Sequence, residues 1–217
     1  MTSFNLNCKK CDRLSDFLTE VRAKHPDYHA LPVPSFGDPN ARLLVVGMAP
    51  GMHGANATGR PFTGDHAGIL LYQTLYDHGF ANQPEGTAVD DGLELSDCRI
   101  TNAVRCLPPQ NKVIAAEVNN CNSYLQEELV TLKPGSVVLA IGGTAHNSIL
   151  KALRLRKAAY KFAHGAQFEI PNNLNLLSSY HCSRYNTNTK RLTAEMFNEV
   201  FTAARALLQN NTGSAAA

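Results

Sequence analysis

The chain has 217 residues, of which 44% are hydrophobic and 18% charged, and its formal net charge is +2. This composition excludes a disordered chain and predicts one globular domain over residues 1–209. No apolar run approaches the roughly 20 residues of a membrane span, and the N-terminus lacks the apolar core of a signal peptide. We therefore expect a cytoplasmic protein that binds no membrane. Residues 210–217 are small and polar, which predicts a disordered tail.

The first half of the chain predicts one buried strand between two helices. Apolar residues at helical spacing predict a helix over residues 12–24, and a proline-rich extended connection follows it. The branched residues 43–46 predict a buried strand, which a glycine-rich loop over 47–65 follows. A second helix is predicted over 67–78. Residues 81–97 are polar and rich in turn residues, so we expect them to form a surface loop.

Strands and helices alternate through the rest of the chain. The predicted strands cover 99–104, 136–141, 167–170 and 174–179, and the predicted helices cover 115–132, 144–154 and 193–208. This alternation predicts a mostly parallel sheet of four or five strands with helices on both faces, a three-layer α/β/α fold. Ligands bind such sheets at the carboxyl ends of the strands.

Three predicted strands end in segments that carry polar or glycine-rich sequence. These are the loop over 47–65, Asn102 with the turn after it, and His181 with the loop after it. Glycines let a backbone approach a ligand closely. A strand, a glycine-rich turn and a helix N-terminus together favour an anion or a flat polar ligand. The alternative interpretation of the first loop is an ordinary crossover between strand and helix.

The spacing of the cysteines indicates a metal centre. Cys8 and Cys11 form a CxxC pattern, and Cys106 and Cys121 follow about a hundred residues later. Four thiolates would bind either zinc or an iron–sulfur cluster. The wide spacing of the second pair favours a centre held between the N-terminal segment and an internal loop. Four incidental buried thiols are the alternative, and the other two cysteines, Cys98 and Cys182, stand apart from this set.

Three motifs resemble the uracil-DNA glycosylase superfamily, and most closely its family 5, the type b enzymes with an iron–sulfur cluster. They are GMAPG with TGRPFTGD after the first strand, ITNAVRCLPPQNK after the second, and SYHCSRYNTNTKRLT after the last. The resemblance covers nearly the whole chain and includes four cysteines in the same order. It implies a single α/β/α domain that flips a damaged base out of DNA and hydrolyses its N-glycosidic bond.

The resemblance implies a DNA repair enzyme with a defined substrate class. The expected activity is that of a monofunctional uracil-DNA glycosylase, which removes uracil and other deaminated bases such as hypoxanthine and leaves an abasic site. The expected partner is double-stranded DNA, with single-stranded DNA left open, and the expected form is a monomer in a bacterial or archaeal cytosol. The family assigns a [4Fe–4S] cluster to Cys8, Cys11, Cys106 and Cys121.

The resemblance also assigns residues that bind the base. Phe62 occupies the stacking position, although an apolar core residue is the alternative. Asn102 matches the position that reads the base edge, because its amide offers a donor and an acceptor to N3–H and O4 of uracil. An asparagine that merely caps a turn is the alternative there. Further residues are expected around the base, namely Gly47, Met48 and Ala49 through their backbone amides and His53 near the same pocket.

Two side chains are expected to carry the chemistry together with Asn102. His181 corresponds to the late histidine of the family, and a neutral imidazole N–H would stabilise negative charge on the departing base. Many superfamily members place an acidic or amide side chain in the first motif, whereas residues 48–50 here provide none. Asp65 is therefore expected to orient the attacking water and stabilise the cationic sugar. The alternative is an N-cap aspartate without chemical function.

The loop after His181 resembles the one that enters the minor groove and fills the vacated space. Cys182 stands where a proline is usual. The residues expected to contact DNA are Arg184, Tyr185, Asn186, Lys190 and Arg191. A solvated basic loop is the alternative. Two other functions stay open from sequence: a protein that binds lesions or abasic sites without turnover, and an iron–sulfur electron-transfer protein.

Overall fold

The protein folds around one six-stranded sheet. A computed structural model describes residues 4–210. The strand order is β1-β3-β2-β4-β6-β5, in which the four central strands are parallel and the two edge strands pair antiparallel. The mostly parallel α/β/α prediction is confirmed. The strands are β1 (Phe36–Gly37), β2 (Leu43–Gly47), β3 (Cys98–Asn102), β4 (Val137–Ile141), β5 (Gln167–Ile170) and β6 (Leu174–Ser179).

The sheet has one strand more than the four or five predicted. The additional strand, β1, pairs only Phe36 and Gly37 with β3 at one edge of the sheet. Two residues show no alternation of polar and apolar side chains, so no local pattern indicates this strand. The other five strands lie where the sequence placed them.

Seven α-helices accompany the sheet in the described part of the chain. They are α1 (Asp12–Lys24), α2 (Ala55–Thr58), α3 (His66–Asp77), α4 (Ala115–Val130), α5 (Gly143–Ala152), α6 (Arg184–Asn188) and α7 (Ala194–Asn210). The five predicted helices are confirmed to within two residues at each end. Helices α2 and α6 were predicted as loop, because four or five residues are too few to show helical periodicity. Asn210 belongs to α7 rather than to the expected tail, and 211–217 lie outside the described residues.

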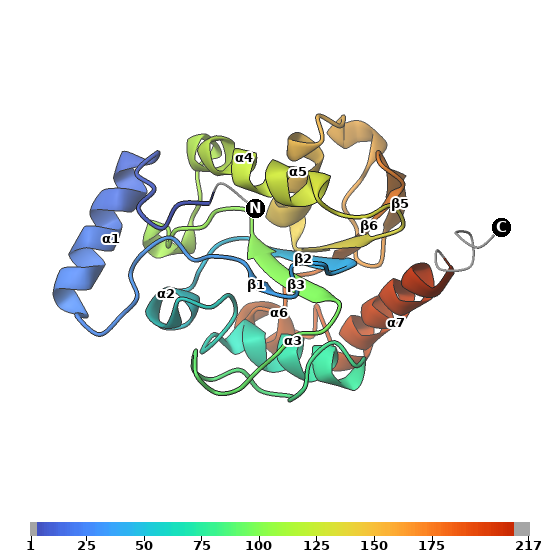
Figure 1. Ribbon diagram of the computed structural model, residues 1–217, viewed down its shortest axis with the longest axis horizontal. Helices are drawn as coiled ribbons and strands as arrows, with labels where there is room; N and C mark the ends of the chain where they lie inside the picture. Colours follow the sequence, from blue (N-terminus) through green and yellow to red (C-terminus); the bar gives the residue numbers. More distant parts are fainter. Residues whose placement is uncertain (1–3, 211–217) are drawn as a thin grey trace.

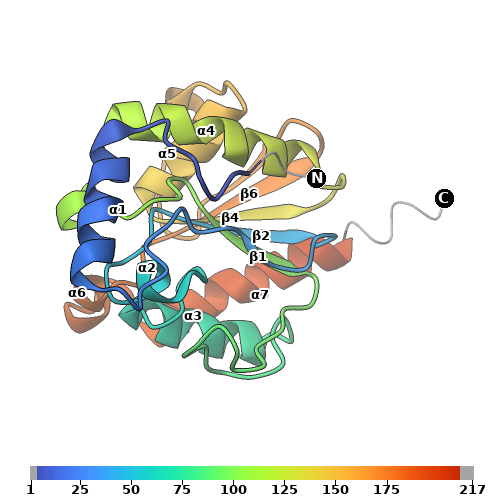
Figure 2. The ribbon, with the colours of Figure 1, turned by 60° about the vertical axis from the view of Figure 1, so that its left-hand side comes forward.

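Helices cover both faces of the sheet, as Figures 1 and 2 show. Helices α3 and α7 lie on one face, and α4 and α5 lie on the other. The alternation of side chains along β2 explains this arrangement, since successive residues of a strand point to opposite faces. Leu43 and Val45 pack into the hydrophobic cluster with α3 and α7, whereas Leu44 and Val46 pack into the cluster with α4 and α5.

Helix α1 lies at the edge of the molecule beside α4 and the loop after β3 (Figure 1). Its apolar stripe of Leu14, Leu18 and Val21 is buried in a third hydrophobic cluster. That cluster also contains Leu107 and Tyr124, from the loop after β3 and from α4. The packing of α1 thus brings the N-terminal segment against the loop that follows the second central strand.

A buried ion pair joins the end of β3 to α4. The Arg105 guanidinium contacts Glu128 Oε2 at 2.6 Å, and both side chains are almost fully buried. The Thr101 hydroxyl donates to the same oxygen at 2.8 Å. Loss of one partner from such a pair leaves an uncompensated buried charge, which is strongly destabilising. These contacts flank Asn102 in the chain and hold the carboxyl end of β3 in place.

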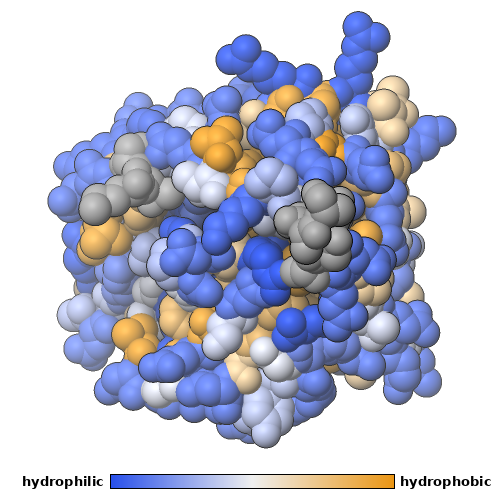
Figure 3. All heavy atoms as spheres, turned by 45° about the vertical axis from the view of Figure 1, so that its right-hand side comes forward, coloured by the Kyte–Doolittle hydropathy of each residue, from blue (hydrophilic) through white to orange (hydrophobic). Residues whose placement is uncertain are grey.

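The surface is mostly polar. Figure 3 shows one face on which hydrophilic residues predominate and hydrophobic residues form separate small groups. None of the helices within residues 4–210 has both the length and the apolar character needed to cross a membrane.

Candidate active site

A cavity of about 500 Å³ lies at the carboxyl ends of the central strands. It brings together the three chain segments that the sequence analysis singled out, which follow β2, β3 and β6. Parallel strands present their carboxyl ends at the same edge of a sheet, so segments distant in sequence converge there. The predicted residues that line the cavity are Met48, Ala49, Phe62, Asp65, Asn102, His181 and Arg184.

The floor of the cavity is formed by Asn102, whose residue is only 3% exposed. Register pairing places Asn102 directly beside Gly47 on β2. A Cβ atom at Gly47 would lie 2.4 Å from Asn102 Oδ1 and 2.8 Å from Phe62 Cζ, so only glycine fits between the two side chains. Gly47 therefore supports the floor from behind and does not line the cavity itself. The Asn102 side-chain amide has no hydrogen-bond partner among residues 4–210, which leaves its donor and acceptor available to a ligand.

Phe62 is held in a strained conformation. Its φ is +60°, in the left-handed region that a bulky residue rarely adopts. Such strain costs about 1–3 kcal/mol and persists only where the surroundings impose it. The Tyr72 hydroxyl donates to the Pro61 carbonyl at 2.6 Å, and Arg60 forms a buried ion pair with Asp91 at 2.6 Å. These contacts hold the residues on the N-terminal side of Phe62 and so fix its ring at the cavity.

The rings of Phe62 and His181 face each other across the site. Their centroids are 6.4 Å apart and their planes are inclined by 24°. A flat base in van der Waals contact with both rings would need them about 7 Å apart. The separation is therefore slightly smaller than the width needed for one planar ring, and a small outward movement of either side chain would admit it.

His181 is neutral at neutral pH because burial lowers the pKa of its imidazole. Its Nδ1 atom is buried and has no hydrogen-bond partner among the described residues. The backbone of His181 is held by Asn186, whose Nδ2 atom donates to the His181 carbonyl at 2.8 Å. A neutral imidazole carries one N–H donor and one acceptor nitrogen.

Asp65 presents a buried carboxylate at the wall of the cavity. It precedes α3, but its side chain makes no capping hydrogen bond to that helix. Its Oδ2 atom accepts instead from the Ala55 N–H at 3.0 Å, and the Gly51 N–H also donates to the carboxylate. Desolvation by burial outweighs these two bonds and raises the pKa of Asp65. A Cβ atom at Gly51 or Gly54 would lie 2.2 or 2.1 Å from this carboxylate, so both glycines make room for it.

His53 does not line the cavity, contrary to the prediction that it approaches the pocket. Its side chain is exposed, and its Nδ1 atom lies 2.8 Å from the Tyr28 hydroxyl. The His53 ring packs edge-on against His25 and Tyr28, whereas Gly51, two residues earlier, lines the cavity. Sequence proximity to the motif does not reveal this difference.

The predicted DNA-contacting residues have different environments. Tyr185 is 71% exposed on α6, and Lys190 is also exposed. The Arg191 guanidinium lies over the Tyr180 ring, 4.8 Å from its centroid. Asn186 donates to the His181 carbonyl and so supports the segment that carries His181. The segment begins as a short helix because the Ser183 hydroxyl accepts from the Asn186 N–H at 3.4 Å.

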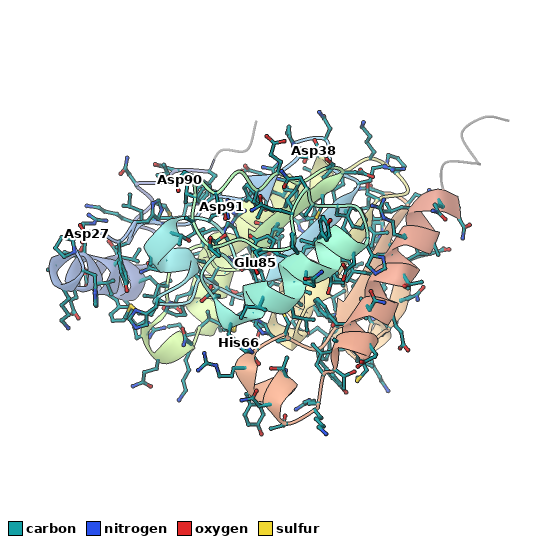
Figure 4. All side chains as sticks on the ribbon, turned by 90° about the horizontal axis from the view of Figure 1, so that it is seen from below. Asp27, Asp38, His66, Glu85, Asp90 and Asp91 are labelled. Carbon is teal, nitrogen blue, oxygen red and sulfur yellow. The ribbon has the colours of Figure 1, made fainter. Side chains whose placement is uncertain are left out.

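Several residues of the cavity were not predicted. They are Gly51, Ala55, His66, Ala67, Asn111, Ile141, Gly142, Gly143, Thr144 and Ser183. Residues 141–144 lie at the carboxyl end of a predicted strand. Because ligands bind parallel sheets at the carboxyl ends of their strands, the sequence could have indicated these residues. His66 Nε2 lies 3.3 Å from Thr187 Oγ1, and Figure 4 shows His66 beside α6. In the same view, acidic residues including Asp90 and Asp91 lie on the side away from α6.

A second, small cavity is lined by all four cysteines expected to bind a metal centre, Cys8, Cys11, Cys106 and Cys121. Two N–H groups point at these sulfurs: Asn120 Nδ2 lies 3.4 Å from Cys11 Sγ, and the Arg105 backbone N–H donates to Cys121 Sγ at 3.4 Å. Burial raises the pKa of the thiols of Cys11, Cys106 and Cys121. The other two cysteines, Cys98 and Cys182, are buried outside this cavity.

The four thiols line one cavity without forming a site for a single metal ion. Within residues 4–210, no three Cys, His, Asp or Glu side chains converge closely enough to hold a single metal ion. Thiolates bound to one zinc ion lie about 3.8 Å apart, given Zn–S bonds of about 2.3 Å in a tetrahedron. In an iron–sulfur cluster each thiolate binds a different iron, so the sulfurs stand further apart. Soft donors and N–H groups aimed at sulfur are also typical of such a site.

A cavity at the strand ends of a parallel sheet, lined by a partly buried carboxylate and by a histidine whose pKa is lowered by burial, is typical of an enzyme active site. The model of the uracil DNA glycosylase superfamily matches residues 34–205. The chain therefore belongs to the uracil-DNA glycosylase superfamily and, by its relatives, to the type-5 family.

These relatives cover nearly the full chain. A type-5 uracil-DNA glycosylase of Thermus thermophilus is 45% identical over 205 residues, which are 92% of this chain and 93% of the relative. The type-5 enzyme of Pyrobaculum aerophilum is 43% identical over 207 residues, 93% of this chain and 89% of the relative. A type-4 uracil-DNA glycosylase of Archaeoglobus fulgidus is 27% identical over 180 residues, 81% of this chain and 76% of that protein.

Proposed function

We propose that the protein is a DNA repair glycosylase that hydrolyses the N-glycosidic bond of uracil in DNA and leaves an abasic site. One observation carries the proposal: Asn102 is only 3% exposed, its side-chain amide has no partner among the described residues, and it lines the same cavity as Phe62 and His181. Buried polar groups are almost always hydrogen-bonded, so an amide left free at the floor of a cavity indicates a polar ligand.

The base is bound by stacking and by its polar edge. Uracil would insert beside the Phe62 ring with its N3–H and O4 toward the Asn102 amide, which offers one acceptor and one donor. Cytosine presents the opposite pattern at the same edge, and the buried amide would then be mispaired. A mispaired buried polar group costs about 1–3 kcal/mol, which supplies discrimination.

Hydrolysis separates charge, and two side chains are placed to stabilise it. Negative charge develops on the departing base, and the neutral His181 imidazole can donate its N–H to that base once the ring turns edge-on to it. Positive charge develops on the sugar, and the Asp65 carboxylate faces the cavity from the wall. Asp65 would also orient a water molecule for attack on the sugar carbon, while its two backbone hydrogen bonds keep the carboxylate in place.

The substrate approaches from the side of α6. Arg184 lines the cavity, and Tyr185 and Lys190 are exposed nearby on the same segment. Cationic groups neutralise phosphates, and an exposed aromatic ring can occupy the gap that an extruded base leaves. We infer that the partner is double-stranded DNA, with Arg191 and Asn186 supporting the segment through Tyr180 and His181 rather than contacting DNA directly.

We further infer that the four cysteines hold a [4Fe–4S] cluster. The cluster would supply a covalent connection between the segment before α1 and the loop after β3, because Cys8 and Cys11 precede α1 whereas Cys106 and Cys121 belong to the body of the fold. The N–H groups of Asn120 and Arg105 would donate to the bound thiolates. A visible absorption band in freshly purified protein, together with iron and sulfide analysis, tests this assignment against zinc.

Other deaminated bases are proposed as secondary substrates. The cavity lining includes Ala49 and Gly143, whose small size leaves space around a bound base. The whole cavity of about 500 Å³ lies within the range of sites that bind drug-sized ligands. Hypoxanthine has a lactam N–H and carbonyl like those of uracil, so the same amide could read its edge.

The test is a cleavage assay on matched duplexes. Purified protein is incubated with labelled duplexes that contain U·G, U·A, hypoxanthine or only normal bases, and abasic sites are cleaved with alkali. We expect product from both uracil substrates and none from the normal duplex. Absence of product from every modified substrate would refute the enzyme activity, and tight binding of abasic DNA in that case would favour the lesion-binding alternative.

A further inference from the structure

Helix α3 begins at the cavity with free backbone N–H groups. Its first two residues, His66 and Ala67, line the cavity. The first N–H groups of a helix have no partner inside the helix, and a side chain in front of the helix commonly caps them. Asp65 stands in that position, but its carboxylate accepts from the Ala55 and Gly51 N–H groups instead. No hydrogen bond within residues 4–210 occupies the backbone N–H of His66 or Ala67, so both donors are available to a ligand.

The start of α3 favours an anion. Aligned peptide dipoles give the N-terminus of a helix a partial positive charge, and its free N–H groups can bind negative ligands. The first turn of α3 contains no acidic residue. The exposed Arg184, which also lines the cavity, adds a positive charge. Among the described residues that line the cavity, Asp65 is the only acid, and the Ala55 N–H already binds its Oδ2 atom. The charges at the start of α3 therefore favour a phosphate.

His66 adds a side-chain donor that is only weakly engaged. Its Nε2 atom lies 3.3 Å from Thr187 Oγ1, on the short helix α6 that Figure 4 shows beside it. Thr187 Oγ1 also lies 3.2 Å from the carbonyl oxygens of Ser183 and Arg184, which can only accept. The hydroxyl therefore donates to one of these carbonyls and accepts from the His66 Nε2–H. This bond is longer than the usual length of about 2.9 Å, so a charged phosphate oxygen is the stronger acceptor.

The floor of the same cavity indicates where the rest of a ligand lies. Asn102 is only 3% exposed and its side-chain amide has no partner among residues 4–210, so a polar group is expected to bind it. His66 is half-buried and Arg184 is exposed, so these two residues line the mouth of the cavity. An extruded nucleotide stays attached to its DNA strand. A base at the floor therefore places its sugar and phosphate at the mouth.

We propose that His66 and the N-terminus of α3 form a phosphate-binding site for the nucleotide whose base is extruded. The inference rests on the proposed glycosylase function and adds a specific contact to it. The His66 Nε2–H leaves Thr187 and donates to a phosphate oxygen, and the free N–H groups of His66 and Ala67 bind the same phosphate. Thr187 keeps its hydrogen bond to a carbonyl of its own segment. Because this contact forms only when the nucleotide has turned into the cavity, it stabilises the extruded state.

The first test removes the contact from the protein and from the DNA in turn. His66→Phe keeps a planar ring without N–H donors, and one uncharged methylphosphonate replaces the phosphate on the 5′ or the 3′ side of the deoxyuridine. Single-turnover cleavage of each U·G duplex is measured as enzyme concentration rises. On the unmodified duplex, the half-saturating concentration of His66→Phe should exceed that of the wild type about tenfold, as for loss of a hydrogen bond to a charged group. On one of the two modified duplexes, the two proteins should agree within about twofold. A tenfold difference on all three duplexes, or on none, would overturn the site.

The second test separates phosphate binding from support of α6. If His66 acted only by holding α6, Thr187→Val would cause the same loss as His66→Phe, and that result would refute the site. We expect Thr187→Val to stay within about twofold of the wild type, because a phosphate replaces the hydroxyl as acceptor. His66→Gln keeps an N–H donor and should recover part of the affinity that His66→Phe loses. His78→Phe is the matched control, because this histidine follows the other end of α3 and its Nε2 atom lies 2.6 Å from Asn198 Oδ1.

The outcomes separate this site from the proposed function. If the wild-type protein releases no uracil from the unmodified duplex, the glycosylase proposal fails and the phosphate site fails with it. If the wild-type protein cleaves that duplex and His66→Phe matches it, only the phosphate site fails. Denaturant unfolding checks that each variant is folded, and His66→Ala takes the place of His66→Phe if the larger ring does not fit.

Discussion

The active-site cavity and the cysteine cavity both depend on the segment that follows β3, but they are assembled differently. Asn102 ends the strand itself, and its position is fixed by register with Gly47 on the neighbouring strand. Cys106 lies four residues later, and two of its partners, Cys8 and Cys11, belong to a segment outside the sheet. The active-site cavity is therefore formed by loops and helix starts at the carboxyl ends of the sheet strands. The cysteine cavity joins the body of the fold to an N-terminal segment that packs against it through α1, Phe4 and Lys10.

The two cavities also differ in their electrostatics. In the active-site cavity, burial lowers the pKa of His181, which favours its neutral form. Burial also raises the pKa of Asp65, whose carboxylate accepts two backbone N–H groups. In the cysteine cavity, burial raises the pKa of three thiols, and Lys10 also lines this cavity. The proposed metal centre would stabilise these thiols in their thiolate form. The active site needs no added group to reach its geometry.

The largest effect is expected from removal of the active-site charge. Asp65→Asn should lower the single-turnover rate of uracil cleavage about 10³-fold, since it removes the carboxylate that orients water and stabilises the cationic sugar. DNA binding should change by less than about threefold, because the amide keeps one acceptor for the loop N–H groups. Asp77→Asn, on the exposed C-terminal turn of the same helix α3, is the control. An active Asp65→Asn protein would place the catalytic acid elsewhere.

Loss of the cysteines should lower the stability of the protein more than its catalytic activity. Replacement of Cys8 and Cys11 by serine should lower the free energy of unfolding by about 3 kcal/mol, as for loss of a covalent link between distant segments. Denaturant unfolding measures this change, and visible absorbance reports the metal centre. We expect residual uracil cleavage, because the sheet still forms the floor of the active site. Complete loss of activity with an intact fold would contradict the independence of the two cavities.

A single methyl group should disrupt the floor of the active site. Gly47→Ala places a Cβ atom 2.4 Å from Asn102 Oδ1 and 2.8 Å from Phe62 Cζ, so at least one of these side chains must move. Overpacking of this kind costs about 1–3 kcal/mol. We expect uracil cleavage to fall by about 10- to 100-fold while spectra of the metal centre are unchanged. Gly92→Ala is the control at a position with open space, although its positive φ predicts a small stability loss.

The smallest expected effect is on the way the free energy of unfolding depends on acidic pH. His146 is fully buried, and desolvation lowers the pKa of its imidazole below the usual value of 6.5. The unfolded chain therefore binds the proton first, so this contribution to stability is present above pH 6.5 and is lost as pH falls toward the folded pKa. The free energy of unfolding should decrease between pH 7 and 5. His146→Gln should show a shallower decrease than the wild type in denaturant titrations at each pH, and an unchanged slope would exclude His146 as the cause.

Local sequence pattern was sufficient for the central elements and for the position of the site. Leu43–Gly47 is an apolar run that predicts a buried strand, whereas Cys98–Asn102 and Leu174–Ser179 mix apolar and polar residues. A glycine-rich loop follows the first strand, and polar residues lie at or after the ends of the other two. Parallel strands must end at the same edge of the sheet, so Asn102, Asp65 and His181 were expected to converge, and the structure places all three on one cavity. The chemical roles of these residues stay proposals that the experiments above test.

Only the tertiary structure decided which neighbouring residues face the cavity. His53 and Asn111 illustrate the difference: His53 lies in the glycine-rich motif but contacts Tyr28, and Asn111 lies in the second motif without an expected role but lines the cavity. Side-chain direction in irregular backbone depends on contacts between distant segments, such as Arg13 with the Lys112 carbonyl, 99 residues apart. Periodicity records the burial of regular elements, whereas these contacts exist only once the chain has folded.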